Sequence, residues 1–160
     1  MPLSKLREFL DRNQIQYLVI SHSVAYTAQG IAALTHIKGK ELAKTVMVMV
    51  DGRLAMAVVP ASFRVDLRKL GKYLGAETVE LATEQEFRNR FPDCETGSMP
   101  PFGNLYGMDV FVDESLAEDK EVSFNAGTHR ELVRMRFEDF ERLCKPFVIP
   151  IAARTVAQVA

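Results

Sequence analysis

The sequence has little cysteine and no long apolar run, and each shortage excludes a class of protein. Its two cysteines, Cys94 and Cys144, are too few for a disulfide scaffold and lack the spacing of a zinc site. No stretch is long and apolar enough to cross a bilayer, and the first residues alternate charged and apolar types, unlike a secretory signal. We therefore expect two free thiols, no membrane association and a cytoplasmic location.

The chain also lacks an excess of charge of either sign. Its 20 Lys and Arg residues against 21 Asp and Glu residues leave a net charge of −1. A basic surface that binds nucleic acid over much of the protein is therefore not indicated, and DNA is not an expected partner. One local basic cluster near an expected helix could contact phosphate, although a solvated helix face is the simpler explanation. Its residues are Arg64, Arg68, Lys69 and Lys72.

What the chain does contain suits one ordinary domain. Its 160 residues, 48% hydrophobic and 26% charged, can bury a core. The strongest structural signal is a hairpin, in which apolar runs at residues 44–50 and 53–59 flank Asp51-Gly52. Because both runs are almost continuously apolar, we expect central strands of a sheet that is covered on both faces.

Further elements are expected where capping residues precede amphipathic runs and where short β-rich runs occur. Helices are expected to follow the caps Ser4, Thr27, Asp66 and Thr83 and to run to about residues 13, 34, 74 and 90, with a last helix at about 138–144. Strands are expected at residues 17–21, 78–81, 108–112, 121–124 and 132–135. The apolar tail after the last helix is expected to cover a sheet edge or a partner.

The most unusual stretch is the loop from Cys94 to Gly103, which reads Cys-Glu-Thr-Gly-Ser-Met-Pro-Pro-Phe-Gly. Its prolines fix the middle of the loop, and its glycines let the chain bend on either side. Such a loop can hold the backbone amides of Gly97, Ser98 and Met99 ready for a polar ligand, as transition-state stabilisation requires. A proline-stiffened surface turn is the alternative.

Three polar residues stand at the ends of expected strands. Lys44 begins the first hairpin strand, His22 follows the strand at residues 17–21, and His129 precedes the strand at residues 132–135. A lysine beside so much apolar surface can reach into a cleft and bind an anion or a carbonyl oxygen, although spacing alone favours a solvated lysine at the sheet edge. Functional loops gather at strand ends, but histidines there are more often structural.

Three motifs occur in a particular order: Leu42-Ala-Lys44-Thr at the start of the central strand, Gly-x-x-Pro-Pro-Phe-Gly ending at Gly103, and Ala-Gly-Thr-His ending at His129. Together they resemble the YbaK-like aminoacyl-tRNA deacylases, which are related to the editing domain inserted in bacterial prolyl-tRNA synthetases. The resemblance implies one α/β domain with a mixed, strongly curved β-sheet flanked by helices. Residues 1–146 would form the editing domain, and residues 147–160 an apolar tail of the same domain.

The resemblance also implies hydrolysis of the ester that joins a mischarged small amino acid to the 3′ end of tRNA. Lys44 would hold the terminal adenosine or the ester region, the Gly97 backbone the ester carbonyl or attacking water, and His129 would lie near the aminoacyl pocket. No metal or other cofactor is implied, since the terminal hydroxyl of the tRNA would help to activate water. The implied substrate-binding residues are His22, Ser98, Met99, Pro100, Pro101, Phe102, Gly103 and Thr128.

The residue chemistry agrees with this interpretation, because an activated ester needs positioning and support of a developing oxyanion more than a dedicated nucleophile. Thr45 follows Lys44, where the branch that clears alanine from proline tRNA has asparagine, so the amino acid removed stays open. Aminoacyl-tRNA is the expected partner, delivered by an aminoacyl-tRNA synthetase or an elongation factor. Two alternatives are a non-catalytic tRNA- or synthetase-binding module with the same fold, and a thiol hydrolase that uses Cys94 with His129.

Overall fold

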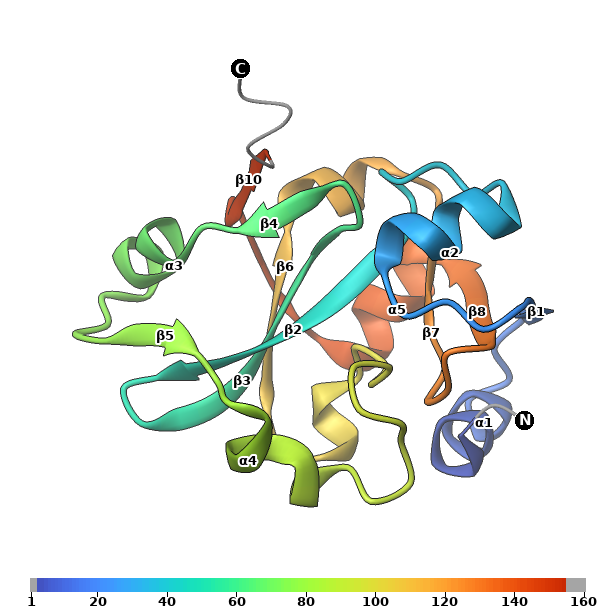
Figure 1. The fold of residues 1–160 in the computed structure, drawn as a ribbon, viewed down its shortest axis with the longest axis horizontal. Coiled ribbons are helices and arrows are strands. Elements are labelled where there is room, and N and C mark those ends of the chain that lie inside the picture. The colour runs from blue at the N-terminus through green and yellow to red at the C-terminus, as the bar shows by residue number, and fades with distance from the viewer. Residues whose placement is uncertain (1–2, 155–160) are drawn as a thin grey trace.

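The strands of the expected hairpin lie in the middle of the larger sheet. β2 (Ala43–Val50) and β3 (Arg53–Pro60) pair antiparallel, and the turn residues Asp51 and Gly52 have φ angles of 47° and 82°. A two-residue turn of type I′ requires positive φ at both positions, and Asp-Gly adopts it readily. The hairpin prediction is thus confirmed in the computed structural model, which describes residues 3–154 (Figure 1).

The strands around this hairpin form three sheets. They are β1 (Tyr17–Ser21), β4 (Phe63–Val65), β5 (Val79–Leu81), β6 (Asp109–Asp113), β7 (Glu121–Asn125), β8 (Glu131–Arg136), β9 (Phe147–Ile149) and β10 (Ala152–Arg154). The five-stranded sheet has the order β5-β2-β3-β6-β9 and is mixed, because β6 runs parallel to β3 and to β9. A three-stranded antiparallel sheet has the order β1-β8-β7, and β4 pairs with β10.

The mixed α/β fold that we expected is confirmed, but its strands divide over three sheets instead of one. An isolated parallel bridge between Leu42 and Ser123 connects the five-stranded sheet to the three-stranded sheet. The two sheets therefore meet at the start of β2, immediately before Lys44. This junction places the first residues of β2 beside the last residues of β7.

The helices cover the sheets and begin mostly where their caps predict. They are α1 (Ser4–Arg12), α2 (Ala28–Thr35), α3 (Leu67–Leu74), α4 (Glu84–Phe87) and α5 (Phe137–Cys144). The caps predicted at Thr27, Asp66 and Thr83 are confirmed, because each side chain accepts a hydrogen bond from the backbone of its helix. Within residues 3–154, no helix is both long enough and apolar enough to cross a membrane.

The cap predicted at Ser4 is wrong. Helix α1 begins at Ser4 itself, and the preceding residue, Leu3, makes no side-chain cap. The Leu3 N–H instead donates a hydrogen bond of 2.8 Å to the carbonyl oxygen of Ala126. The start of α1 is thus fixed by a turn that lies more than a hundred residues further along the chain, and no local signal in the sequence could show this.

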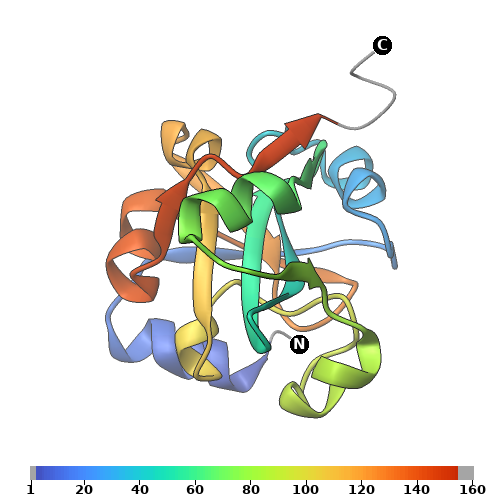
Figure 2. The ribbon, with the colours of Figure 1, turned by 90° about the vertical axis from the view of Figure 1, so that its left-hand side faces the viewer.

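Apolar side chains cover the five-stranded sheet on both faces, as the continuous apolar strands predicted. On one face Phe102 lies in the main core, where its ring contacts Phe9, Phe124 and Phe140 at centroid distances of 5.8, 5.7 and 5.2 Å. On the other face α3 packs on the strands through Leu70, and Figure 2 shows this helix in front of the sheet. The loop that supplies Phe102 is therefore anchored in the core.

The described part of the C-terminal tail forms strands in two of the sheets. β9 forms an edge of the five-stranded sheet, and β10 pairs with β4, as expected for a tail that covers an edge. One carboxylate oxygen of the buried Asp113 accepts hydrogen bonds from the N–H groups of Ile151 and Ala152, both at 2.8 Å. Residues 155–160 of the expected tail lie outside the described residues, and a boundary at residue 146 stays a prediction.

Candidate functional site

Two loops that the sequence singled out meet at one end of the three-stranded sheet. The Glu95 N–H donates to the Gly127 carbonyl at 2.9 Å, and the Gly127 N–H donates to the Ser98 carbonyl at 3.0 Å. The Glu95 side chain also accepts a hydrogen bond of 3.0 Å from the His129 N–H. A Cβ atom added to Gly97 would lie only 3.5 Å from Cε1 of the His129 ring. The structure therefore brings Gly97 and His129 together.

Gly97 presents an unused backbone donor beside His129. Its φ of +88° lies in the left-handed region, which glycine adopts without strain. Among the described residues, none accepts a hydrogen bond from the N–H of Gly97 or of Met99. Ser98 departs from our expectation, because its N–H donates to the Glu95 carbonyl at 3.1 Å and its side chain is fully buried. The amides held ready are thus those of Gly97 and Met99.

The buried His129 ring has one nitrogen in use and one without a partner. Its Nε2 lies 2.8 Å from the Thr96 carbonyl oxygen. Because a carbonyl only accepts, Nε2 carries the hydrogen, and Nδ1 of the neutral ring is an acceptor. Within the described chain, no donor reaches Nδ1. The ring of Tyr26 packs on His129 with a centroid distance of 4.7 Å, although Tyr26 itself is 75% exposed.

Two further buried acceptors without described donors lie at the same end of this sheet. His22 Nδ1 lies 2.6 Å from the Ser23 carbonyl oxygen, so Nε2 of the neutral ring is the acceptor that lacks a partner. The Oδ1 atom of Asn125 is the other. His22 continues the pairing of β1 with β8 through a hydrogen bond to Arg130, and Asn125 ends β7. Buried acceptors normally have donors, so this group indicates a place where a donor-bearing ligand fits.

Lys44 adds an unpaired cation at the same junction. The parallel bridge joins Leu42 to Ser123, so Lys44 and Asn125 each lie two residues beyond it in the same direction. Burial lowers the pKa of the Lys44 ammonium, which is half buried. Among the groups that the structure describes, no carboxylate or carbonyl oxygen lies within hydrogen-bond or ion-pair distance of it. A buried cation without a counter-charge favours an anion or a polarised carbonyl as its partner.

The other predicted substrate-binding residues are less accessible. Thr128 lies half buried in the turn before His129, with its hydroxyl directed to Glu131 at 3.4 Å. The rest are buried, and a Cβ at Gly103 would approach the Met108 carbonyl oxygen to 2.6 Å. A substrate contact for these residues stays a prediction. They are Met99, Pro100, Pro101, Phe102 and Gly103.

The alternative nucleophile, Cys94, has no histidine beside its thiol among the described residues. Its sulfur lies 3.7 Å from the Tyr106 hydroxyl, and burial raises the pKa of the thiol above its ordinary value. The described contacts of the His129 ring are with Thr96 and Tyr26, not with Cys94. A thiol with a raised pKa and no adjacent base is a poor nucleophile. In residues 3–154, no three His, Cys, Asp or Glu side chains are grouped so that they could hold a metal ion.

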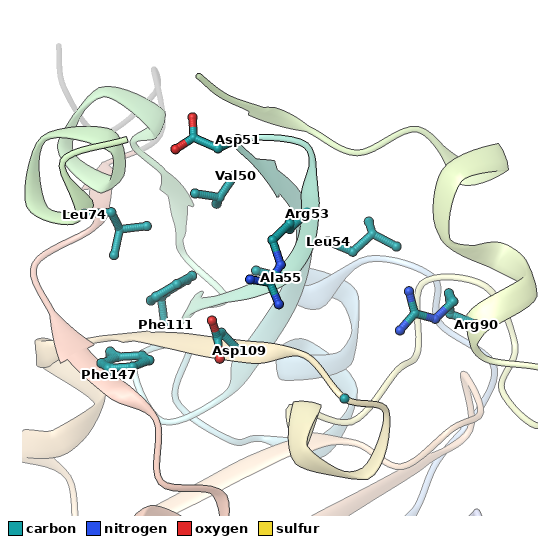
Figure 3. Close-up of a pocket in the computed structure, with 11 residues that line it drawn as sticks. Val50, Asp51, Arg53, Leu54, Ala55, Leu74, Arg90, Asp109, Phe111 and Phe147 are labelled. Carbon is teal, nitrogen blue, oxygen red and sulfur yellow. The ribbon is translucent and has the colours of Figure 1, made fainter. Parts of the chain in front are cut away.

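A separate hollow of about 550 Å³ lies at the other end of the hairpin. Figure 3 shows Arg53, Asp109 and Arg90 around it, with the rings of Phe111 and Phe147 at one side. Those two rings stack at 5.5 Å between centroids. A strand advances about 3.3 Å per residue, so the turn end of β2 lies about 20 Å from Lys44. The described lining of this hollow includes none of the residues at the junction.

The sequence analysis missed three residues at the junction of the two loops. Glu95 and Asn125 lie inside or beside the quoted motifs, so their polar side chains were a signal that could have been used. Tyr26 had no such signal, because its contact with His129 depends on how the chain turns after β1. These additions give the site a positioning carboxylate, an acceptor and an aromatic cover.

Comparison with known proteins relates most of the chain to an editing domain. A protein-family model described as "Aminoacyl-tRNA editing domain" matches residues 22–143. The proline–tRNA ligase of Leuconostoc citreum (strain KM20) is 31% identical over 105 residues, which are 66% of this chain and 18% of the ligase. The ligase of Bacillus cytotoxicus is 30% identical over 87 residues, which are 54% of this chain and 15% of that protein. The chain thus corresponds to a small part of each ligase.

Solved structures share the fold at lower sequence identity. The crystal structure of the hypothetical protein APE2540 superposes with a TM-score of 0.84 at 19% identity, over 94% of this chain and all of that one. A structure described as "a putative trans-editing enzyme for prolyl tRNA synthetase" has a TM-score of 0.80 at 21% identity, over 93% and 95% of the two chains. Both are close to this chain in length and architecture.

Proposed function

Because the chain belongs to the aminoacyl-tRNA editing domain family, we propose that it hydrolyses the ester of a mischarged aminoacyl-tRNA. The observation that carries this proposal is the junction of the two sheets. It combines three buried acceptors, one half-buried ammonium and one glycine N–H, none of which has a partner among the described residues. The proposed substrate supplies the complementary groups.

The three acceptors suit the hydrogen-bond donors around an aminoacyl ester. Such an ester carries the α-ammonium group of the amino acid and the free hydroxyl of the terminal ribose. The Nδ1 atom of His129, the Nε2 atom of His22 and the Oδ1 atom of Asn125 can accept from these groups. Each bond would satisfy a buried acceptor, so binding would recover hydrogen bonds that the described residues do not make.

Lys44 supplies a positive charge and Gly97 a hydrogen-bond donor for the proposed reaction. The ester carbonyl oxygen gains negative charge as water attacks the carbonyl carbon. A backbone N–H and an ammonium directed at this oxygen would stabilise that charge without rearranging, because both are held by the fold. In this proposal Gly97 donates its N–H to the carbonyl oxygen, and the Lys44 ammonium lies beside it or beside the terminal phosphate.

The attacking water needs a group that takes its proton. We place this role on the free hydroxyl of the terminal ribose, which takes a proton from water as it passes its own proton to the departing ribose oxygen. His129 Nδ1 would orient the attacking water by accepting a hydrogen bond from it. The bond between the carbonyl carbon and the ribose oxygen breaks as the new carbon–oxygen bond to water forms. The products are a free amino acid and a tRNA whose ribose oxygen has regained a proton. No metal takes part in the proposed step.

The proposed substrate carries a small amino acid. A carbon added at Gly97 would be in van der Waals contact with His129, at 3.5 Å, and the ring of Tyr26 packs on His129. We propose that these groups admit a small misattached side chain and exclude a larger cognate one, as a second sieve does. We further propose that aminoacyl-tRNA reaches the site from a synthetase or an elongation factor.

Deacylation of a panel of esters tests this function directly. tRNAs charged with alanine, cysteine, serine and larger amino acids are incubated with the protein, and loss of the ester is followed against spontaneous hydrolysis. We expect hydrolysis of one or more small-residue esters and none of the large ones. If no ester is hydrolysed above background although the protein binds tRNA, the chain is a binding module and the proposed enzyme function is wrong.

A further inference from the structure

The outer side of α3 carries a group of exposed cations beside an aromatic ring. Arg68, Lys69, Lys72 and Tyr73 are exposed on this helix, and Arg64 is exposed on the adjacent β4. We call these five residues the basic face. The proposed site does not include any of them, and the four cations are the local basic cluster that the sequence showed.

The charge of the basic face is not neutralised nearby. Between Arg64 and Lys72 the sequence has one carboxylate, Asp66. Its Oδ1 atom caps α3 by accepting from the N–H groups of Arg68 and Lys69, both at 3.1 Å. Within residues 3–154, no carboxylate lies within ion-pair distance of Arg64, Arg68 or Lys72. The Lys69 ammonium donates to the Ala152 carbonyl at 3.2 Å, so it keeps its charge.

Two of these cations, Arg68 and Lys69, lie where they oppose the helix dipole, whereas Lys72 lies in the last turn of α3, where a cation is favourable. The first turn of α3 contains Arg68 and Lys69 and no acidic residue, although the amino end of a helix favours negative charge. Each cation in such a position costs about 0.3–1 kcal/mol of stability at low ionic strength. A departure from the favoured local pattern is expected where binding uses the charge.

A hollow lies against the basic face. It has a volume of about 600 Å³ and is lined by Lys69, Lys72, Tyr73 and Pro150. Tyr73 is 58% exposed, so its ring is available to a ligand. Cations that follow a phosphate chain, together with an aromatic ring on which a base or ribose can stack, are the combination that nucleic-acid backbones bind.

The basic face begins near the proposed site and extends away from it. Lys44 pairs with Val59 near the end of β3, and β4 and α3 follow directly in the chain. In Figure 1, β4 crosses the top of the molecule from the junction of the sheets toward α3 on the left, while β1, β8 and β7 lie on the right. A long ligand with its end at Lys44 can therefore continue along β4 and α3.

We propose that the basic face binds the sugar-phosphate backbone of the tRNA body while the charged 3′ end occupies the site beside Lys44. This inference rests on the proposed function, and it names the surface that holds the substrate outside the site. It also explains how a chain with a net charge of −1 can hold a polyanion, because the attraction is local. Each phosphate contact should appear in the salt dependence of binding.

Binding of uncharged tRNA at several salt concentrations tests the proposal without any catalysis. We compare wild-type protein, the double variant Arg68→Ala/Lys72→Ala, and the matched control Arg12→Ala/Lys120→Ala, which removes two exposed cations elsewhere. We expect the first double variant to bind about tenfold more weakly at low salt, with a slope of log affinity against log salt reduced by about 2. The control variant should bind as wild type does.

Hydrolysis of two substrates then distinguishes the contribution of the basic face to tRNA binding from the contribution of the site to hydrolysis. The Arg68→Ala/Lys72→Ala variant should lose kcat/KM on full aminoacyl-tRNA but keep the wild-type rate on the same ester of a short oligonucleotide. The proposal is overturned if the variant binds tRNA with wild-type affinity and salt slope, if the control loses as much affinity, or if the short ester is affected equally. Should wild-type protein bind tRNA but hydrolyse neither ester, the proposed function fails while the binding result still decides this proposal.

Discussion

Lys44 carries a half-buried charge that no described group neutralises, which is costly in a residue with a purely structural role. Its ammonium is half buried at the start of β2, and burial lowers its pKa. Burying a charge without a partner destabilises the fold, so the cost is offset only when a ligand supplies the partner. The acceptor atoms of His129, His22 and Asn125 are also buried without a partner among the described residues, so they need hydrogen-bond donors from a ligand, whereas Lys44 needs a negative group.

The lowered pKa of Lys44 predicts an early loss of activity at alkaline pH. The ammonium is charged below its folded-state pKa and neutral above it, so deacylation should fall as pH rises through a value below that of an ordinary lysine. Stability should rise over the same range, because the unfolded chain binds this proton more tightly. Initial rates across pH, corrected for spontaneous ester hydrolysis, measure the alkaline limb.

The matched control for this pH profile is Lys44→Arg, since a guanidinium stays charged throughout the range. Its activity should be lower than that of wild type, because the two cations differ in shape, but its alkaline limb should be absent. An alkaline limb at the same pH in Lys44→Arg would show that another group titrates, and the role given to the Lys44 charge would be wrong.

At the scale of elements, the site depends on how two loops are joined. Glu95 connects the loop that carries Gly97 to the turn that carries His129, through its backbone and its side chain. Neither loop has a regular strand partner at these residues, so these hydrogen bonds set the distance between Gly97 and His129. Loops held in this way by a rigid sheet are where functional groups commonly lie.

Glu95→Ala should therefore lower kcat with little change in KM. The variant loses the hydrogen bond from the His129 N–H, and a charge-assisted bond of this kind contributes enough to change a rate by about tenfold. Glu95→Gln keeps an acceptor oxygen and should recover most of the activity. Steady-state kinetics on one charged tRNA measures both parameters. Wild-type kcat in Glu95→Ala, or a Gln variant as slow as the Ala variant, would contradict this role.

Elements whose signals are local could be predicted from the sequence. The turn at Asp51-Gly52 and the capping box at Thr83 are determined within a few residues, and both are confirmed. The start of α1 was predicted wrongly, because Leu3 bonds to the distant Ala126. Division of the strands over three sheets was likewise not predictable, since it depends on tertiary packing.

The site could be predicted only in part. The motifs that end at Gly103 and His129 indicated the family, and the match over residues 22–143 confirms it. The proximity of Gly97 to His129 agrees with what the resemblance implied, but the catalytic roles stay predictions. Which amides and ring nitrogens are unpaired could not be known, because hydrogen-bond partners such as Thr96 are set by the folded loops.

At the scale of the whole molecule, the C-terminal segment holds the sheets together. β9 completes an edge of the five-stranded sheet, and β10 pairs with β4, which leads into α3. The buried Asp113 joins these parts, because one oxygen accepts from Ile151 and Ala152 while the other accepts from the N–H of Ser115. The basic face and the junction of the two larger sheets thus share one framework.

Asp113→Ala should destabilise the whole domain. It leaves the N–H groups of Ile151 and Ala152 without their acceptor, and each buried unsatisfied donor costs about 1–3 kcal/mol. We expect the free energy of unfolding in urea to fall by about 3 kcal/mol or more. Asp109→Ala, which removes an exposed carboxylate from the same strand, should change it little. Equal stability of Asp113→Ala and wild type would show that this carboxylate does not hold the tail.

The most direct test of the central claim is the hydrolysis rate of the preferred charged tRNA by wild type and Lys44→Met under single-turnover conditions. The methionine keeps an unbranched side chain and removes the charge, so circular dichroism should show a folded protein. We expect a rate loss of about 100-fold or more, as for removal of an oxyanion-stabilising group, while Cys94→Ala keeps the wild-type rate. A folded Lys44→Met that hydrolyses the ester at the wild-type rate would contradict the account.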